Sequence, residues 1–468
     1  MNMEWMMRDY VTVSGTLRRL GLAAMLATAS IPSSGAAMAD APAAVSLTPA
    51  QASLVARARA LGATDIATKP APGGGFILDG KLAGRQFAVA FPPNWNKGAL
   101  LYVHGYSTPG TPVAVLDDPL AKGTGANGVL LDAYNDGYAA GHSAYDKAGM
   151  GVQTATENTL RLRDFLTTLG TRRTLLTGTS MGGNIVLSLI EQHPRAFAGA
   201  MTSCGVTDGW ESLFGQLIDM RAAYNLLTRD TPYALPGEHD LTKSALPTEP
   251  PAGDKTNAEA FRWGQIIRIA SPVLALFKAA DADPKGREAR IVQQIAAISG
   301  FEAEPASFAF PLVTATLGED DLRTTLGGDI YGNVGKIYAA PAFTAEEAIA
   351  FNRDVQRIAA DPRAVANARR WHQATGRFTV PLVTLHNRID SLVPYAQSQA
   401  LGRIVARAGN QRLLVQYTVP GVKAPLPVPG GVQGYTHCGF TPEQSAGTWQ
   451  ALRDWVEKGR RPAADAVR

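Results

Sequence analysis

Hydrophobic residues recur along this chain with two periods, and their alternation predicts the class of fold. Short apolar runs bounded by Gly, Pro, Asn or His predict strands at residues 86–91, 99–103, 138–145, 173–177 and 197–201. Apolar residues three and four positions apart predict helices between them, at 156–169 and 184–192. Strands that alternate with helices indicate an α/β fold, a mostly parallel sheet with helices on both faces.

The alternation stops near residue 206 and resumes near residue 378. The intervening pattern predicts long helices at 210–227, 257–280, 287–298 and 344–360. Strands then return at 379–385 and 413–417, with helices at 395–408 and 443–458, while the Pro- and Gly-rich stretch 420–434 is typical of a loop. Because the later strands need a sheet to complete, we predict one α/β domain, residues 40–205 and 378–468. A helical insertion, residues 206–377, interrupts it.

The first 39 residues have the layout of a secretory signal peptide. Arg18 and Arg19 precede a short apolar run at 20–27, and Ala37 and Ala39 form an A-x-A cleavage pattern before Asp40. The run is too short to span a bilayer, which takes about 20 apolar residues. We therefore expect an exported protein, periplasmic or secreted, without a stable membrane span. A frayed N-terminal helix is the alternative.

Composition excludes several classes of protein. The 468 residues include 44 Lys and Arg, 40 Asp and Glu, and only two Cys, and 46% are hydrophobic. This hydrophobic fraction excludes a disordered chain, and the small net charge of +4 gives no basic stripe for nucleic acid. Two cysteines cannot build a disulfide scaffold or a Cys-rich zinc site. The acidic groups at 281–283 and 319–321 are expected to be solvated loops, so no metal site and no cofactor is predicted.

The sequence Gly178-Thr179-Ser180-Met181-Gly182 is the first candidate for chemistry. It follows one predicted strand and opens the next helix. A G-x-S-x-G pattern there places serine on a sharp turn, where glycines avoid Cβ clashes and the helix N-terminus favours a developing anion. The alternative, an ordinary Gly-rich turn, does not require serine. Ser180 is therefore the candidate nucleophile.

A serine nucleophile needs a base, and the base needs a carboxylate to orient it. Of the seven histidines, only His437 lies in a loop after the last predicted strand. Asp390 follows the strand predicted at 379–385, which gives the chain order Ser180, Asp390, His437. Asp208, after the preceding strand, is the competing acid.

The segment His104-Gly105-Tyr106 directly follows the strand predicted at 99–103. A glycine turn at that place can aim the backbone N–H of Tyr106, together with that of Met181, at a carbonyl oxygen that becomes an oxyanion. We expect His104 to brace this loop without touching the substrate.

These four segments resemble the α/β-hydrolase-fold serine hydrolases of the esterase and lipase type. The resemblance implies that Ser180 is the nucleophile, His437 the general base and then acid, and Asp390 the orienting carboxylate. It also implies a helical cap, here the insertion 206–377, between the sixth and seventh core strands. In this fold Cys204 and Cys438 would lie at neighbouring strand ends, and export permits oxidation, so we predict a disulfide bond between them.

The leading functional hypothesis is the hydrolysis of a carboxylic ester, with a small-molecule or oligomeric substrate. An exported peptidase of the prolyl-oligopeptidase or aminopeptidase type and an acyltransferase use the same triad and stay open. A non-catalytic binding protein usually lacks a member of the triad, whereas this sequence keeps all three. Bulky residues of the insertion could line a pocket or pack the cap onto the core: Phe214, Leu217, Ile218, Phe261, Trp263 and Ile267.

Overall fold

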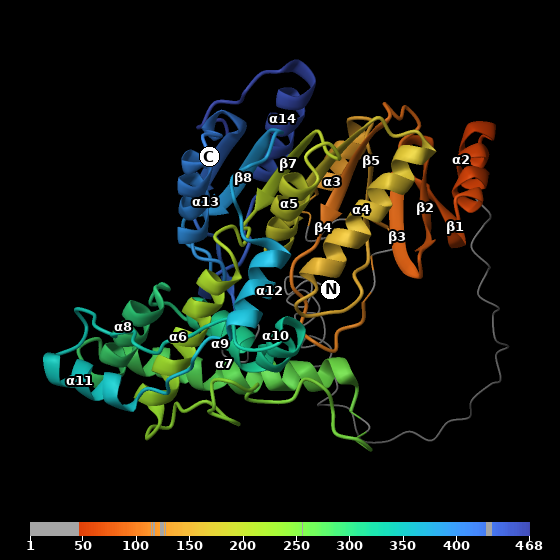
Figure 1. Ribbon diagram of the computed structural model, residues 1–468. Coiled ribbons are helices and arrows are strands. Elements are labelled where there is room, and N and C mark those ends of the chain that lie inside the picture. Colours follow the sequence, from red (N-terminus) through yellow and green to blue (C-terminus); the bar gives the residue numbers. More distant parts are fainter. Residues whose placement is uncertain are drawn as a thin grey trace, which may run out of the picture.

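The computed structural model describes residues 46–113, 115, 118–121, 126, 128–254, 256–426 and 433–468. The predicted signal peptide, residues 1–39, lies outside the described residues. The described chain is built around one nine-stranded sheet (Figure 1). Its strands are β1 (Thr64–Ala71), β2 (Gly75–Leu82), β3 (Arg85–Phe91), β4 (Gly98–Val103), β5 (Ala139–Ser143), β6 (Arg173–Thr179), β7 (Gly199–Ser203), β8 (Leu382–Asn387) and β9 (Leu414–Val419).

The strand order is β1-β2-β3-β5-β4-β6-β7-β8-β9. The six strands from β5 to β9 run parallel to one another, and β1, β2 and β3 form an antiparallel edge, with β3 antiparallel to β5. The predicted α/β architecture, a mostly parallel sheet with helices on both faces, is thereby confirmed. Parallel strands end at the same edge of the sheet, so the loops after β4, β6, β7 and β8 gather there.

Both faces of the sheet are covered, which explains the apolar runs in its central strands. Along β4, Leu101 and Val103 belong to one hydrophobic cluster, and Leu100 and Tyr102 belong to a second. Side chains of a strand point alternately to opposite faces, so these two clusters lie on the two sides of the sheet.

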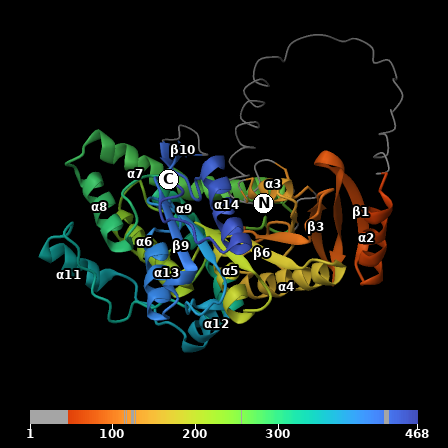
Figure 2. The ribbon, with the colours of Figure 1, turned by 90° about the horizontal axis from the view of Figure 1, so that it is seen from above.

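Helices from distant parts of the sequence supply the rest of each cluster. One face packs against α2 (Pro49–Ala60), α4 (Val152–Leu169), α5 (Met181–Gln192) and α13 (Ala396–Arg407). The other packs against α3 (Val129–Asn135) and α14 (Pro442–Lys458). Figure 2 shows α4 and α5 on one side of the sheet and α3 and α14 on the other.

The helices between β7 and β8 gather at one end of the sheet (Figure 1). They are α6 (Trp210–Thr228), α7 (Ala258–Ala282), α8 (Arg287–Ser299), α9 (Ala306–Leu317), α10 (Glu319–Leu326), α11 (Ala345–Asp354) and α12 (Pro362–His372). The sequence places the helical insertion after the sixth core strand. In the structure the insertion instead lies between β7 and β8, because β1 and β2 precede residue 86 and shift the strand numbering.

Elements without a clear period are the ones that the sequence pattern missed. The strands β1 and β2 lie before the first predicted strand at 86–91, and polar residues such as Asp79 and Lys81 interrupt the apolar positions of β2. Helix α9 is buried almost all round, so it lacks the one-sided pattern by which a helix is recognised. Helix α11 is shorter than predicted and ends at Asp354.

Short elements complete the description. The 3-10 turns η1 (Pro72–Gly74) and η2 (Gln411–Leu413) precede β2 and β9. The stretch predicted as a loop begins after β9 and includes the short strands β10 (Lys423–Pro425) and β11 (Gln433–Tyr435), which pair antiparallel just before His437. Among the described residues, no helix combines the length and apolar character that crossing a membrane requires.

Candidate active site

Ser180 occupies a strained turn between β6 and α5. Its backbone has φ 56° and ψ −123°, a conformation that costs a non-glycine residue about 1–2 kcal/mol. A Cβ at Gly178 would lie 2.4 Å from the carbonyl oxygen of Gly182, and one at Gly182 would lie 2.0 Å from that of Val103. The flanking glycines are therefore required by close packing. Ser180 retains 9% of its exposed surface.

Asp390 and His437 are in direct contact. The ring Nδ1 of His437 lies 2.7 Å from Oδ1 of Asp390. The same carboxylate also accepts the backbone N–H groups of Leu392 and Val393 through Oδ1, and that of Cys438 through Oδ2. An acceptor with four donors is ionised, so Nδ1 of His437 carries the proton and Nε2 is the unprotonated ring nitrogen.

The side chain of Asp390 has no exposed surface. Burial alone acts to raise its pKa, but the nearby His437 ring and its hydrogen bonds outweigh burial and hold the pKa of Asp390 below the ordinary value. The competing acid, Asp208, makes its hydrogen bonds through its backbone, to the side chains of Gln397 and Gln373. Asp390 is therefore the acid that the fold brings to the histidine.

The two cysteines form the predicted disulfide bond, with 5.3 Å between their Cα atoms. The backbone N–H of Ser180 donates to the carbonyl of Ser203, the residue before Cys204. Cys438 follows His437, and its Sγ lies 3.4 Å from Nε2 of the imidazole. The bond thus ties the loop next to the serine to the loop of the histidine. Sulfur, carboxylate and imidazole atoms lie within 4.8 Å here, but both sulfurs are in the disulfide and offer no thiolate ligand.

Residues 104–110 after β4, named here the β4 loop, carry the predicted donor Tyr106. The ring of His104 stacks on that of Tyr145 at 3.7 Å, and the Tyr145 hydroxyl donates to the carbonyl of His104. Burial lowers the pKa of His104 to about 3, so the ring is neutral, and its Nδ1 donates to the carbonyl of Gly105, 2.9 Å away. A trans peptide points its N–H away from its C=O, so this bond sets the direction of the Tyr106 N–H.

The other predicted donor, Met181, is the first residue of α5 and is buried. The two donors belong to neighbouring segments, because Gly182 packs against the carbonyls of Val103 and His104. Next to the serine, Thr179 shares a hydrogen bond with the hydroxyl of Tyr102 in β4. No sequence motif marks Tyr102 or Tyr145 as residues of the site. The only signal in the sequence is that each lies at the end of an apolar run predicted to be a strand.

The residues suggested as pocket lining divide between two helices. Phe214, Leu217 and Ile218 of α6 are buried in the hydrophobic cluster and pack the insertion together. The remaining candidates lie on α7 and are partly exposed: Phe261, Trp263 and Ile267.

One of the two acidic groups differs from expectation. Glu319, Asp320 and Asp321 begin helix α10, and Glu319 is only 4% exposed, so they do not form a solvated loop. Burial raises the pKa of Glu319 to about 8. The group at Asp281 and Asp283 is exposed at the end of α7, as predicted.

Asn184 connects α5, the helix that begins at the serine turn, to both ends of the insertion. Its carbonyl oxygen accepts the indole N–H of Trp210 at the start of α6, and its amide N–H donates to the carbonyl of His372 at the end of α12. Asn184 is completely buried. The insertion is therefore anchored within one helical turn of the candidate nucleophile.

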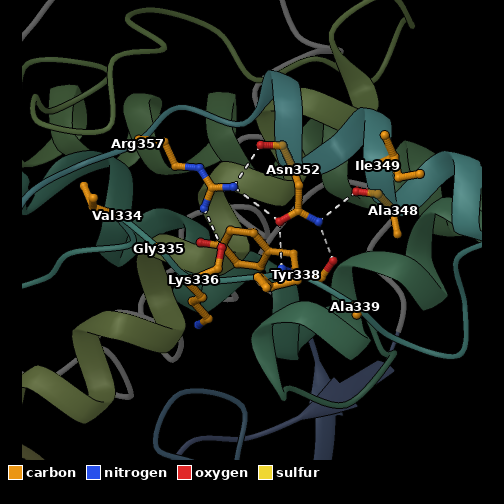
Figure 3. Close-up of a pocket in the computed structure, with 10 residues that line it drawn as sticks. Val334, Gly335, Lys336, Tyr338, Ala339, Ala348, Ile349, Asn352 and Arg357 are labelled. Carbon is orange, nitrogen blue, oxygen red and sulfur yellow. Dashed lines mark hydrogen bonds between the residues drawn. The ribbon is translucent and has the colours of Figure 1, made fainter.

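A surface cavity of about 540 Å³ lies within the insertion, between residues 334–339 and α11. Its guanidinium, from Arg357, donates to the carbonyls of Lys336 and Asn352 (Figure 3). It also donates to the carbonyl of Asn333. These bonds occupy the cation with backbone oxygens, so it braces the surrounding loop.

Comparison with known proteins adds distant structural similarities. No protein-family model matches the sequence. No curated protein matches it either. Among solved structures, feruloyl esterase B from Aspergillus oryzae shares 14% identity, with 86% of this chain and 88% of that chain covered and a TM-score of 0.44. Lipase A from Candida antarctica shares 12% identity, with 86% and 84% covered and a TM-score of 0.40. These identities and TM-scores are too low to transfer an activity to this chain.

Proposed function

We propose that this chain is a serine hydrolase that cleaves a carboxylic ester through an acyl-enzyme on Ser180. The observation that carries the proposal is the hydrogen bond between an ionised, fully buried Asp390 and His437, tied by the disulfide to the loop next to a strained serine. This combination of an oriented base and a serine on a strained turn has the chemistry of acyl transfer.

The steps follow from these atoms. Nε2 of His437 takes the hydroxyl proton as Oγ of Ser180 attacks the carbonyl carbon, and the N–H groups of Tyr106 and Met181 bind the resulting oxyanion. His437 gives that proton to the leaving alcohol oxygen as the C–O bond breaks. A water molecule then attacks the acyl carbon, loses a proton to His437 and releases the carboxylic acid. The same proton returns to Oγ of Ser180.

Labelling with a fluorophosphonate tests the nucleophile. We expect the native protein to be labelled and Ser180→Ala to remain unlabelled, with Ser188→Ala, a buried serine of the same helix, as the control. Equal labelling of the native protein and Ser180→Ala would remove Ser180 as the nucleophile. p-Nitrophenyl esters of increasing chain length, assayed beside peptide anilides, separate an esterase from a peptidase, and added alcohol acceptors reveal acyl transfer.

We also propose that the protein is exported. A disulfide bond between its only two cysteines supports this, because such bonds persist in oxidising compartments. Mass spectrometry of the protein from the culture medium or periplasm should find Asp40 or a near neighbour at its N-terminus. Recovery of full-length chain from the cytoplasm alone would contradict export.

A further inference from the structure

Two contacts fix the course of the β4 loop, one from the helical insertion and one from the segment around Gly149. At the end of the loop, Nη1 of Arg262 in α7 donates to the carbonyl of Gly110, at 2.9 Å. Arg262 is almost completely buried, with 3% of its surface exposed. In the middle of the loop, the carbonyl of Ser107 accepts the backbone N–H of Gly149, also at 2.9 Å. The path of the loop that contains Tyr106 therefore depends on what fixes Gly149 and Arg262.

One carboxylate of the insertion fixes the segment around Gly149. Oδ2 of Asp321, in the first turn of α10, accepts the backbone N–H of Met150 at 2.8 Å. Oδ1 of the same side chain accepts Nζ of Lys147, which also donates to Thr325 of α10. Asp321 is thus bonded to both sides of Gly149.

Close packing leaves little freedom in this arrangement. Gly149 has φ 76°, and a Cβ there would lie 2.2 Å from Oδ2 of Asp321. A Cβ at Gly318, just before α10, would lie 2.8 Å from the hydroxyl oxygen of Tyr106. Burial raises the pKa of Tyr106, and the charges of Asp321 and Glu319 raise it further. The beginning of α10 therefore lies directly against both Gly149 and the Tyr106 side chain.

We propose that Asp321 is a positioning residue for ester hydrolysis: it holds Lys147 and Met150 so that Gly149 fixes Ser107 and directs the adjacent Tyr106 N–H at the reacting carbonyl oxygen. This inference rests on the function proposed above. It gives the insertion a role in the rate of the reaction.

The expected consequence is a loss of turnover with little loss of substrate affinity. A donor aimed at the oxyanion acts in the transition state, so its misplacement lowers kcat and leaves KM nearly unchanged. Removal of one such donor costs about 100- to 1,000-fold in kcat, and a loosened donor costs less, about tenfold.

The test compares Asp321→Asn with Asp320→Asn. Asp320 lies in the same helical turn, is exposed, loses the same charge and bonds to Ser244 instead of the segment around Gly149. Four quantities are measured: kcat and KM with a p-nitrophenyl ester, the inhibition constant of an aryl boronic acid that forms a tetrahedral adduct, and the rate of amide hydrogen exchange in residues 104–110.

For Asp321→Asn we expect kcat to fall about tenfold, KM to change by less than about twofold, and boronate affinity to weaken about as much as kcat falls. Exchange in residues 104–110 should become faster. Asp320→Asn should remain within about twofold of the native protein in every measurement. Equal losses in the two variants, or unchanged kcat and exchange in Asp321→Asn, would overturn the proposal.

The Lys147→Met variant and the activity of the native protein provide two further tests. Lys147→Met changes a side chain that is 39% exposed and removes one partner of Asp321, so it should lower kcat about threefold even if Asp321→Asn does not fold. Unchanged kcat in Lys147→Met would count against the proposal. A native protein that neither cleaves esters nor reacts with fluorophosphonate would contradict the proposed function. Hydrogen exchange would still decide whether Asp321 holds the loop.

Discussion

The carboxyl edge of the sheet and the helical insertion differ in how far along the chain their buried polar groups find hydrogen-bond partners. Two of the donors to Asp390 come from Leu392 and Val393, within three residues of it. In the insertion, the fully buried Arg221 donates to four backbone carbonyls that lie 17 to 94 positions away: Glu238, Asp240, Lys243 and Ala315.

This difference teaches where each region is vulnerable. A buried cation or carboxylate is stable only while its partners surround it, and the loss of one partner leaves a costly charge. The insertion contains two such centres, Arg221 and the buried Asp219, which pairs with Lys336 and two tyrosines. At the edge of the sheet, local turns and one disulfide hold the candidate catalytic groups. Changes at Asp390 should therefore act mainly on activity, and changes at Arg221 or Asp219 mainly on stability.

The largest effect is expected from Asp390→Asn. An amide cannot hold His437 in the tautomer whose Nε2 is unprotonated, so kcat for a p-nitrophenyl ester should fall about 1,000- to 10,000-fold. The matched control is Asp208→Asn, whose side chain accepts none of the bonds described for the site and should change kcat by less than about threefold. A loss in Asp208→Asn alone would reassign the acid and remove the contrast between the two regions.

The disulfide bond comes next. Its cysteines are 234 positions apart, and the bond encloses the whole insertion, so it removes much of the freedom of the unfolded chain. Replacing both with serine should lower the free energy of unfolding by about 2–5 kcal/mol in guanidinium denaturation. Reduction of the native protein should give the same loss. If neither treatment changes the midpoint, the bond does not hold the two regions together.

Glu319 should make the stability of the insertion depend on pH. Its pKa is about 8 in the folded protein against 4.5 as the ordinary value, so the folded state retains a proton that the unfolded state has lost. The stabilisation is complete below about pH 4.5 and is lost as pH rises through about 8, by an amount on the order of a few kcal/mol. Glu319→Gln should remove this dependence in urea unfolding at pH 5 and 9, whereas Asp320→Asn should keep it. A native protein equally stable at both values would contradict the prediction.

The smallest effect is expected from Arg369→Ala. Arg369 of α12 pairs with Glu211 of α6, but 61% of its side chain is exposed. Water and salt screen such pairs, so the change should leave the urea midpoint of unfolding nearly unchanged. A double-mutant cycle with Glu211→Ala isolates the pair. A coupling of several kcal/mol would show that exposed pairs matter as much here as buried ones.

The candidate triad could be predicted because each of its residues lies next to a strand or helix boundary that the local sequence pattern marks. Ser180 lies between a strand and a helix, and Asp390 and His437 follow strands or precede a helix in a fixed order. The residues that hold the β4 loop give no such signal. Asp321 and Met150 are 171 positions apart, and Arg262 and Gly110 are 152 positions apart. Their contacts depend on how the insertion docks, which no spacing in the sequence encodes.

Charge patterns were misleading for a related reason. Three consecutive acidic residues at 319–321 predict solvation, because isolated carboxylates avoid the interior. Glu319 is nonetheless buried, and Asp321 forms an ion pair with Lys147, which belongs to the α/β domain and not to the insertion. Local composition therefore fails to predict the burial of an acidic residue when its partner lies far away in the sequence.

The two ends of the insertion lie side by side, so the segment between them could be replaced without separating the flanking strands. The amide of Gln373 donates to the carbonyl of Asp208, although 165 positions separate them. Residues 374–381 then lead to β8, which pairs with β7. A graft between positions 208 and 373 would therefore keep the crossover between these parallel strands whatever its length. Because Trp210 and His372 lie within the exchanged segment, the graft must itself supply an N–H donor and a carbonyl acceptor for the buried Asn184.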